Sequence, residues 1–183
     1  MSPSSNHRMY YVALLCPPEI DREVSSLKQY MRQQYGCVAA LKSPAHITLV
    51  APFWYEEPRE EQLLSLLGGF HSDVGNLDLH LQGFSHFERK VLFIAVDPSP
   101  ALEELRNQAF RHFHQALGPA LRPDDRPFHP HVTIATRDLR PSAFVAAWEY
   151  FSRQTFEARF TGARISLLKL FPGQWQVIRD QAW

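Results

Sequence analysis

The chain has 183 residues, in which 19 basic side chains are balanced by 19 acidic ones, so its formal net charge is +0. A neutral chain has no global field to attract a long polyanion, which excludes binding of long nucleic acid through many phosphate contacts. Any nucleic-acid substrate should therefore be small or be held at one end. The 13 phenylalanines and four tryptophans supply enough apolar surface for a folded core.

Other features of the composition indicate the class of protein. The longest apolar run, residues 9–16, is far shorter than the ~20 residues that cross a bilayer. Residues 1–8 are polar, lack the order of a signal peptide and are expected to form a loose end. Cys16 and Cys37 are too few for a disulfide scaffold. We therefore expect a cytoplasmic protein that binds no membrane, acts as a monomer and forms one domain over residues 1–183.

The first half of the chain alternates strand patterns with helix patterns. Residues 9–16 are rich in β-branched and aromatic side chains and stop at two prolines, which is typical of a buried strand. Apolar residues then recur at helical spacing over 20–35. A second strand is expected near 46–53, a short helix over 63–70, and a strand over 77–82 in which leucines alternate with polar residues.

The second half repeats this order. Strand patterns occupy 91–96, 131–136 and 156–161, and helical spacing occupies 102–116 and 144–151. Any αβ protein alternates such elements, so the order alone does not establish a duplication.

Corresponding positions of the two halves support the repeat. Pro17 and Pro98 are 81 residues apart, and Leu77 and Phe156 are 79 apart. We predict an α+β fold with two pseudo-symmetric lobes, whose mostly antiparallel sheets line a central cleft and whose helices lie outside. A short C-terminal extension is expected to follow the second lobe.

Two tetrads of the same type occupy equivalent positions in the repeat. One is His46-Ile47-Thr48-Leu49 and the other is His131-Val132-Thr133-Ile134, 85 residues apart. With average residue usage, nine histidines give only about 0.1 to 0.2 such tetrads by chance. Residues two apart in a strand share a face, so each histidine should lie beside its threonine. If the lobes pack about a pseudo-twofold axis, two imidazoles and two hydroxyls meet in one cleft.

This set of groups suits phosphodiester chemistry without a metal. With an ordinary pKa of ~6.5, one histidine can be neutral and act as a base while the other is protonated and acts as an acid. Each such proton transfer typically contributes ~10²- to 10⁴-fold in rate. The hydroxyls of Thr48 and Thr133 would hold the phosphoryl oxygens.

The two segments that carry the tetrads, residues 42–53 and 128–135, resemble the paired His-x-Thr motifs of the two-histidine (2H) phosphoesterase superfamily. They are most similar to its 2′-5′ RNA ligase-like, RNA 2′,3′-cyclic phosphodiesterase branch. The resemblance implies no cofactor, a bilobal fold and a substrate with a 2′,3′-cyclic phosphate or a 2′-5′ phosphodiester, at an RNA end or in a small nucleotide. It also implies that His46 donates a proton and that His131 accepts one.

The chain departs from that branch in one place, and other residues are candidates for substrate contacts. Many members carry an arginine five residues after the second histidine, where this chain has Thr136 followed by Arg137. Arg137 shares the face of His131 only if that strand continues, and otherwise lies in a solvated loop. Further candidate contacts are His80 and Arg159 on matched strands, and Lys42 and Arg126 in the loops that precede the two motifs.

Three alternatives remain open. His129 and His131 together with His46 could bind a metal ion, but no carboxylate stands at a ligand spacing and the threonines would have no role. The cleft could bind a nucleotide without turning it over. The same residues could also act on a small cyclic phosphate that is not RNA, such as one of ADP-ribose, or on a phosphopantetheine-type ester.

Overall fold

The computed structural model describes residues 6–123 and 127–183 of the chain. Its strands and α-helices are, in order, β1 (His7–Leu15), α1 (Pro18–Tyr35), β2 (His46–Glu56), α2 (Glu60–Gly68), β3 (Leu77–Phe87), β4 (Val91–Val96), α3 (Pro100–Leu117), β5 (His131–Ala135), α4 (Pro141–Phe151), β6 (Glu157–Gly162), β7 (Arg164–Phe171) and β8 (Gln174–Ala182). Short 3₁₀ turns cover Ala39–Lys42, Glu57–Arg59 and Gly118–Ala120.

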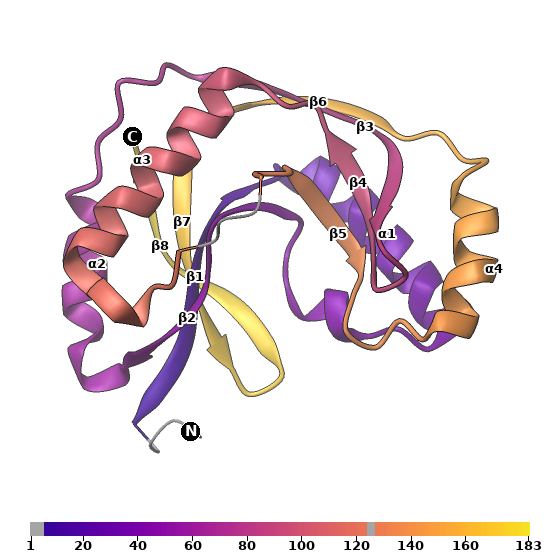
Figure 1. Ribbon diagram of the computed structural model, residues 1–183, viewed down its shortest axis with the longest axis horizontal. Coiled ribbons are helices and arrows are strands. Elements are labelled where there is room, and N and C mark those ends of the chain that lie inside the picture. The colour runs from indigo at the N-terminus through magenta and orange to yellow at the C-terminus, as the bar shows by residue number, and fades with distance from the viewer. Residues whose placement is uncertain (1–5, 124–126) are drawn as a thin grey trace.

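The strands form two four-stranded sheets, with orders β2-β1-β7-β8 and β5-β4-β3-β6, in which every neighbouring pair is antiparallel. The two sheets stand side by side between helices that cover their outer faces (Figure 1). Each sheet begins with the strand that carries one His-x-Thr motif, followed by the first strand of the same half. The predicted α+β, two-lobed fold with antiparallel sheets and outer helices is confirmed.

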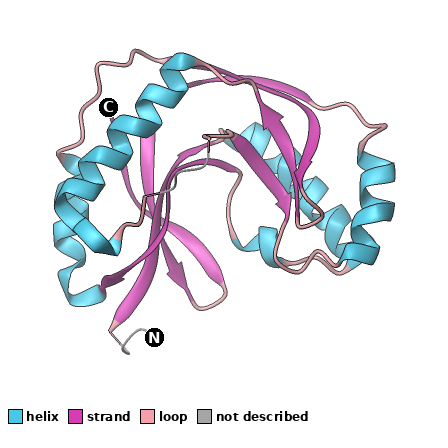
Figure 2. Cartoon of the chain, viewed as in Figure 1, coloured by secondary structure: helices cyan, strands magenta, loops and turns pink. Residues whose placement is uncertain are grey.

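The helices are exchanged between the lobes. α1 follows β1 in the chain but packs on β5, and α3 follows β4 but packs on β2. α2 packs on β8, and α4 packs on α1, so each sheet is covered by one helix from each half. Figure 2 shows the resulting helix pairs at opposite ends of the molecule, with the strands between them. Because of this exchange, neither half of the chain covers its own sheet alone.

Three expectations from the sequence are wrong, two about strand pairing and one about the N-terminal end. The C-terminal residues form the hairpin of β7 and β8, which completes the sheet of β1 instead of extending from the second lobe. β3 and β6 are neighbours in one sheet rather than counterparts in two lobes. By position, the counterpart of β3 is β7, since each lies beside the first strand of its sheet. In addition, residues 7 and 8, which were expected to belong to a loose N-terminal end, are part of β1, because this strand begins at His7.

The helix ends follow the local sequence. In α1, a proline occupies the first turn and Gly36 ends the helix with a φ of 71°, a left-handed conformation that glycine adopts without steric cost. In α3, the Ser99 side chain accepts a hydrogen bond from the Leu102 amide and caps the N-terminus. Cys16 and Cys37 are buried free thiols. None of the helices in the described part of the chain is long and apolar enough to cross a membrane.

The buried apolar side chains form two clusters of unequal size. The larger one fills the space between the sheets and their helices. The smaller one lies on the opposite face of the β2-β1-β7-β8 sheet and is centred on Tyr11, Ala13, Leu168 and Trp175. This second cluster is important for the site, because no helix covers it and it lies on the face that carries the first motif.

Candidate active site

The two motif strands meet where the lobes join. β2 and β5 are in contact, and each begins with its motif histidine, His46 or His131. Both imidazoles are half-buried. Burial is the main cause that lowers the pKa of His46, and the charge of a protonated His131 adds to this effect. The structure therefore brings the two motifs together.

The strand registers place each histidine beside its threonine. In one sheet, His46 and Thr48 lie opposite Leu15 and Ala13 of β1, two residues on one face of that strand. In the other sheet, His131 and Thr133 lie opposite residues 95 and 93 of β4 in the same way. The intervening aliphatic residues, 47 and 132, are fully buried and point toward the helices. Neither threonine hydroxyl has a hydrogen-bond partner among the residues that the structure describes, so both can donate to a ligand.

Both histidines are held in the same way by the backbone. His46 Nδ1 lies 2.8 Å from the carbonyl oxygen of Pro44, and His131 Nδ1 lies 2.6 Å from that of His129. A carbonyl oxygen only accepts, so Nδ1 carries the hydrogen in both rings. In the neutral rings Nε2 then has a free lone pair, and it has no partner among the described residues. Each motif therefore presents a base of fixed tautomer.

The loop before His46 is held by helix α1 from two sides. The Lys28 ammonium donates to the Ser43 carbonyl at 2.8 Å, and the Asp21 carboxylate accepts from the Ala45 amide at 2.6 Å. Lys28 is only 2% exposed, which is unusual for a lysine and makes this hydrogen bond important. The two contacts fix the backbone immediately before His46 and thereby the position of its ring.

The other neighbours of His46 come from β1 and from this loop. The Tyr11 ring lies 4.9 Å from the imidazole between centroids, and its hydroxyl is 2.5 Å from Ser43 Oγ. Burial raises the pKa of Tyr11, so its hydroxyl stays neutral. The Trp175 ring packs edge-on against the Tyr11 ring, with 4.6 Å between centroids, so the two rings form an aromatic surface beside His46. His46 is thus packed on one side and open at Nε2.

These surroundings strongly favour neutral His46. Burial is the main cause that lowers the pKa of His46 to about 4; the hydrogen bond to the Pro44 carbonyl opposes this shift, and the positive charge of Lys28 adds to it. Burial also lowers the pKa of Lys28 to about 8, so the lysine remains mostly charged at pH 7. In the unliganded protein His46 is therefore a neutral base near neutral pH.

His131 has an apolar environment, and no charged side chain among the described residues holds its loop as Lys28 and Asp21 hold the loop of His46. The rings of Phe87 and Phe93 each lie 5.0 Å from the imidazole between centroids. Burial lowers the pKa of His131, the hydrogen bond to the His129 carbonyl opposes this shift, and the positive charge of His129 adds to it. The sequence predicts one neutral and one protonated imidazole near neutral pH, whereas these environments favour the neutral form of both in the absence of substrate.

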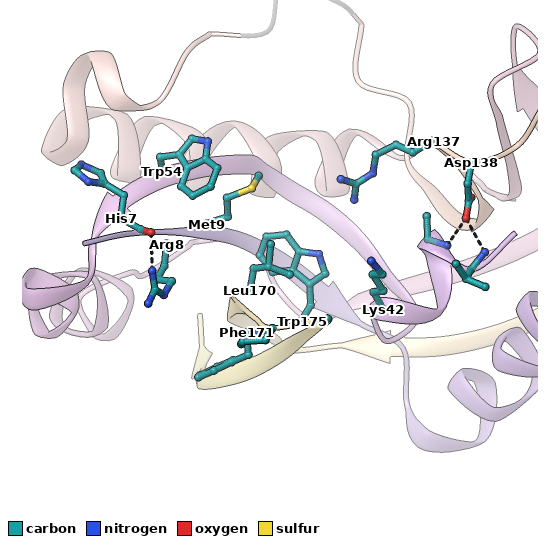
Figure 3. Close-up of a pocket in the computed structure, with 14 residues that line it drawn as sticks. His7, Arg8, Met9, Lys42, Trp54, Arg137, Asp138, Leu170, Phe171 and Trp175 are labelled. Carbon is teal, nitrogen blue, oxygen red and sulfur yellow. Dashed lines mark hydrogen bonds between the residues drawn. The ribbon is translucent and has the colours of Figure 1, made fainter. Parts of the chain in front are cut away.

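A cleft of about 760 Å³ opens beside the two motifs (Figure 3). Its walls come from β1, from the loop between α1 and β2, from the turn after β5 and from the hairpin of β7 and β8. Lys42 and Arg137 extend toward each other at one end, whereas Trp54 and His7 lie at the other. Neither motif histidine lines this cleft among the described residues. The cleft is therefore distinct from the space between the imidazoles, and Trp175 of its lining connects it to His46 through Tyr11.

Of the residues expected to contact substrate, Lys42 and Arg137 line the cleft. β5 ends at Ala135, and Arg137 occupies a turn with a φ of 39°, so the condition that the strand continues is not met. Its exposed side chain nevertheless faces the cleft. Next to it, Asp138 accepts hydrogen bonds from the amides of Val38 and Ala39 at 2.7 and 2.8 Å, which anchors this turn.

The remaining expected contacts lie elsewhere. His80 and Arg159 are direct partners in the β3–β6 ladder, not matched positions in two lobes. The His80 ring nitrogens lie 2.7 Å from an Asp97 oxygen and 3.3 Å from a Glu157 oxygen, so two carboxylates already occupy them. The Arg159 side chain is 69% exposed and lies 3.7 Å from Glu157. Arg126 lies outside the described residues.

Several groups around His46 were not identified from the sequence. Lys28 gave a usable signal, because it is a charged residue on the buried face of α1, between Val24 and Met31. Trp175 gave none, since its place depends on a C-terminal hairpin that pairs with β1. Within residues 6–123 and 127–183, no group of three or more histidine, cysteine or carboxylate side chains is arranged to hold a metal ion.

Comparison with known proteins places this geometry in context. Residues 16–171 match the model of the 2′-5′ RNA ligase superfamily. A crystal structure of Escherichia coli LigT complexed with 3′-AMP has a TM-score of 0.70 and 20% sequence identity, over 96% of this chain and 98% of LigT. The protein TT0787 of Thermus thermophilus has a TM-score of 0.65 and 17% identity, over 96% of this chain and 97% of its own. A search of curated protein sequences finds no match.

Proposed function

The chain belongs to the 2′-5′ RNA ligase superfamily, and we propose that it hydrolyses or reversibly forms a 2′,3′-cyclic phosphate or a 2′-5′ phosphodiester bond, without a metal. Membership of this superfamily supports an enzyme that acts on phosphodiester bonds. The proposed substrate is an RNA end or a small nucleotide. His46 and His131 are the proposed catalytic residues, with Thr48 and Thr133 as ligands of the phosphoryl oxygens.

The observation that carries this proposal is the shared state of the two imidazoles. Each donates Nδ1–H to the carbonyl two residues earlier, and each leaves Nε2 free. Next to each, on the same face of its strand, is a threonine hydroxyl without a partner among the described residues. A base, an acid and two hydrogen-bond donors are the groups that displacement at phosphorus needs.

In this mechanism the attacking water loses its proton to Nε2 of one histidine while the leaving ribose oxygen takes a proton from Nε2 of the other. Following the superfamily resemblance, His131 is the acceptor and His46 the donor. A phosphate anion between the rings favours protonated imidazole and raises the pKa of His46 from the low value that burial gives it in the free protein. Burial makes protonated His46 a strong acid, which favours transfer to the leaving oxygen. The threonine hydroxyls stabilise the charge on the non-bridging oxygens.

The ligands of a structural relative agree with a small phosphate-bearing substrate. Structures of E. coli LigT contain 3′-AMP, phosphate, ATP or NADP+. For the present chain we infer a ligand of the same chemical type, with its phosphate between the two motifs. We further propose that the substrate carries this phosphate as a cyclic ester or a 2′-5′ linkage.

The test is turnover of a 2′,3′-cyclic phosphate oligonucleotide in the presence of a chelator, for the parent and for His46→Ala and His131→Ala. Loss of one proton-transfer group should lower kcat by ~10²- to 10⁴-fold. His71→Ala is a matched control, since His71 is exposed and lies outside both motifs. Activity that disappears with chelator, or that survives both substitutions, contradicts the mechanism. Tight binding of the oligonucleotide without product would instead indicate a non-catalytic nucleotide-binding protein.

A further inference from the structure

One face of the β2-β1-β7-β8 sheet runs without interruption from His46 to Trp54. In the β1–β2 ladder His46 lies opposite Leu15, and Trp54 lies opposite Met9. Residues 9 and 15 of β1 have the same parity and share a face, so their partners on β2 share it too. The β1–β2 ladder shifts its register by one residue twice near Val12. His46 and Trp54 are therefore eight residues apart on β2, an even number that keeps both on the same face. The indole of Trp54 therefore lies on the face that carries the catalytic histidine.

The separation of Trp54 from His46 is longer than a single nucleotide. Met9 and Leu15 are six residues apart, and at ~3.4 Å per residue this corresponds to about 20 Å along the sheet. Tyr11 and Trp175 cover the sheet between these ends and form part of its second apolar cluster. A ligand that reaches both ends would follow this apolar floor.

Trp54 is exposed on β2, which is an edge strand of its sheet. Its side chain is 45% exposed, among the largest values for apolar residues in the described part of the chain. In Figure 3 it lies at the end of the cleft opposite Lys42 and Arg137. An accessible indole on a rigid strand presents a flat surface on which a nucleobase can stack.

The cleft also carries positive charge. Lys42 and Arg137 are exposed, and neither forms an ion pair within the described part of the chain. The carboxylate of Asp138, their acidic neighbour in the cleft, is directed to the amides of Val38 and Ala39. Binding pockets for small ligands span about 300 to 1,000 Å³. The cleft, at about 760 Å³, has room for a ligand in addition to a phosphate held between the histidines.

We propose that this cleft binds the single-stranded RNA immediately 5′ of the terminal phosphate, with an upstream base stacked on Trp54. The inference rests on the proposed function, since the terminal phosphate defines where the RNA enters. When a 2′,3′-cyclic phosphate occupies the histidines, the rest of the chain can extend only from the 5′ side of the terminal nucleotide. Lys42 and Arg137 neutralise backbone phosphates, and the base must be unpaired because pairing buries its faces in a duplex. The substrate is therefore an RNA end of two or more nucleotides rather than a free mononucleotide.

The test compares kcat/KM for a trinucleotide and for a mononucleotide that both end in the same 2′,3′-cyclic phosphate. In the parent we expect a higher value for the trinucleotide. Trp54→Ala should reduce the ratio of the two values about tenfold, the lower part of the range for losing one stacked base. Trp54→Phe should restore most of the ratio, because a phenyl ring still stacks. Tyr150→Ala is the matched control, since Tyr150 is an exposed aromatic residue on α4, away from the cleft.

The outcomes separate this inference from the proposed function. A parent ratio near one, or an unchanged ratio in Trp54→Ala, overturns the RNA cleft while leaving the catalytic assignment intact. If no cyclic phosphate is turned over, the proposed function fails, and fluorescence anisotropy with a 3′-phosphorylated trinucleotide tests the cleft by itself. Binding that is tighter than that of the 3′-mononucleotide, and that Trp54→Ala weakens, supports the cleft. Equal affinities, or no effect of the substitution, reject it.

Discussion

The two lobes carry the same motif in different surroundings. His46 is held through its loop by two charged side chains of α1, Lys28 and Asp21, and lies against Tyr11. His131 packs against two phenylalanines and is held by a backbone carbonyl. Both environments favour the neutral imidazole, mainly by burial, to which the charge of Lys28 adds at His46 and the charge of His129 adds at His131. A duplicated motif can therefore keep its geometry while the electrostatics of its two copies diverge, as an acid and a base require.

The strongest way to test the equivalence of the lobes is to remove one threonine hydroxyl at a time. Thr48→Val and Thr133→Val keep the shape of the side chain but lose the donor. Each should lower kcat by about 10²- to 10³-fold, as expected for one donor to a transition-state oxygen. Steady-state kinetics on the cyclic phosphate substrate would measure this, and Thr→Ser at each position should recover activity. Parental kcat in either valine variant would show that its lobe does not bind the phosphoryl group.

The contacts that hold the loop before His46, from Lys28 and Asp21, can be removed without changing the motif itself. Asp21→Ala removes the acceptor of the Ala45 amide, so the loop can shift and displace the imidazole. We expect kcat to fall about tenfold with little change in KM, because a small displacement of a catalytic group affects reaction more than binding. Asp21→Asn keeps an acceptor oxygen and should recover most of kcat. An equal change in KM and kcat for both variants would contradict a positioning role.

The pH profile distinguishes the two histidines. Since burial lowers the pKa of both histidines, the bell-shaped curve of kcat/KM against pH should have its maximum below pH 6.5. The limb of this curve on the acid side should lie near pH 4, the pKa of His46. The Lys28 charge disfavours protonated His46, so Lys28→Gln should raise the pKa of His46 and move that limb upward by about one unit. The limb of His131 should stay in place, because Lys28 does not contribute to its shift. A parallel movement of both limbs would show that the two histidines are not separately tuned.

The smallest effect concerns the contact between the lobes. A Cβ at Gly162 would lie 3.2 Å from Leu79 of one sheet and 3.4 Å from Leu14 of the other. Gly162→Ala should destabilise the fold by about 1 kcal/mol through overpacking. In a chain of this size that lowers Tm by about 2 to 4 °C. Gly75→Ala, at a position with open space around it, is the matched control. An unchanged Tm would show that the side chains of Leu79 and Leu14 shift to make room for the added methyl group, which would contradict tight packing at this point.

The sequence alone determined the elements that depend on local pattern. Strand alternation placed His46 beside Thr48 and His131 beside Thr133, because side chains two apart in a strand share a face regardless of the fold around them. The prolines and glycines at element ends gave most of the boundaries. The duplicated tetrad predicted that two imidazoles meet, and the β2–β5 contact places the strands that carry them side by side.

The tertiary structure decided what depends on residues far apart in the chain. The pairing of β7 and β8 with β1, the exchange of α1 and α3, and the pairing of β3 with β6 each join segments that no local pattern connects. The pairing of β7 and β8 with β1 places Trp175 beside Tyr11, and the packing of α1 on the loop that precedes β2 places Lys28 behind His46. The pKa of a histidine depends on such burial and on such charges. The sequence therefore identified the chemical groups, and the packing of distant segments set their protonation and the cleft beside them.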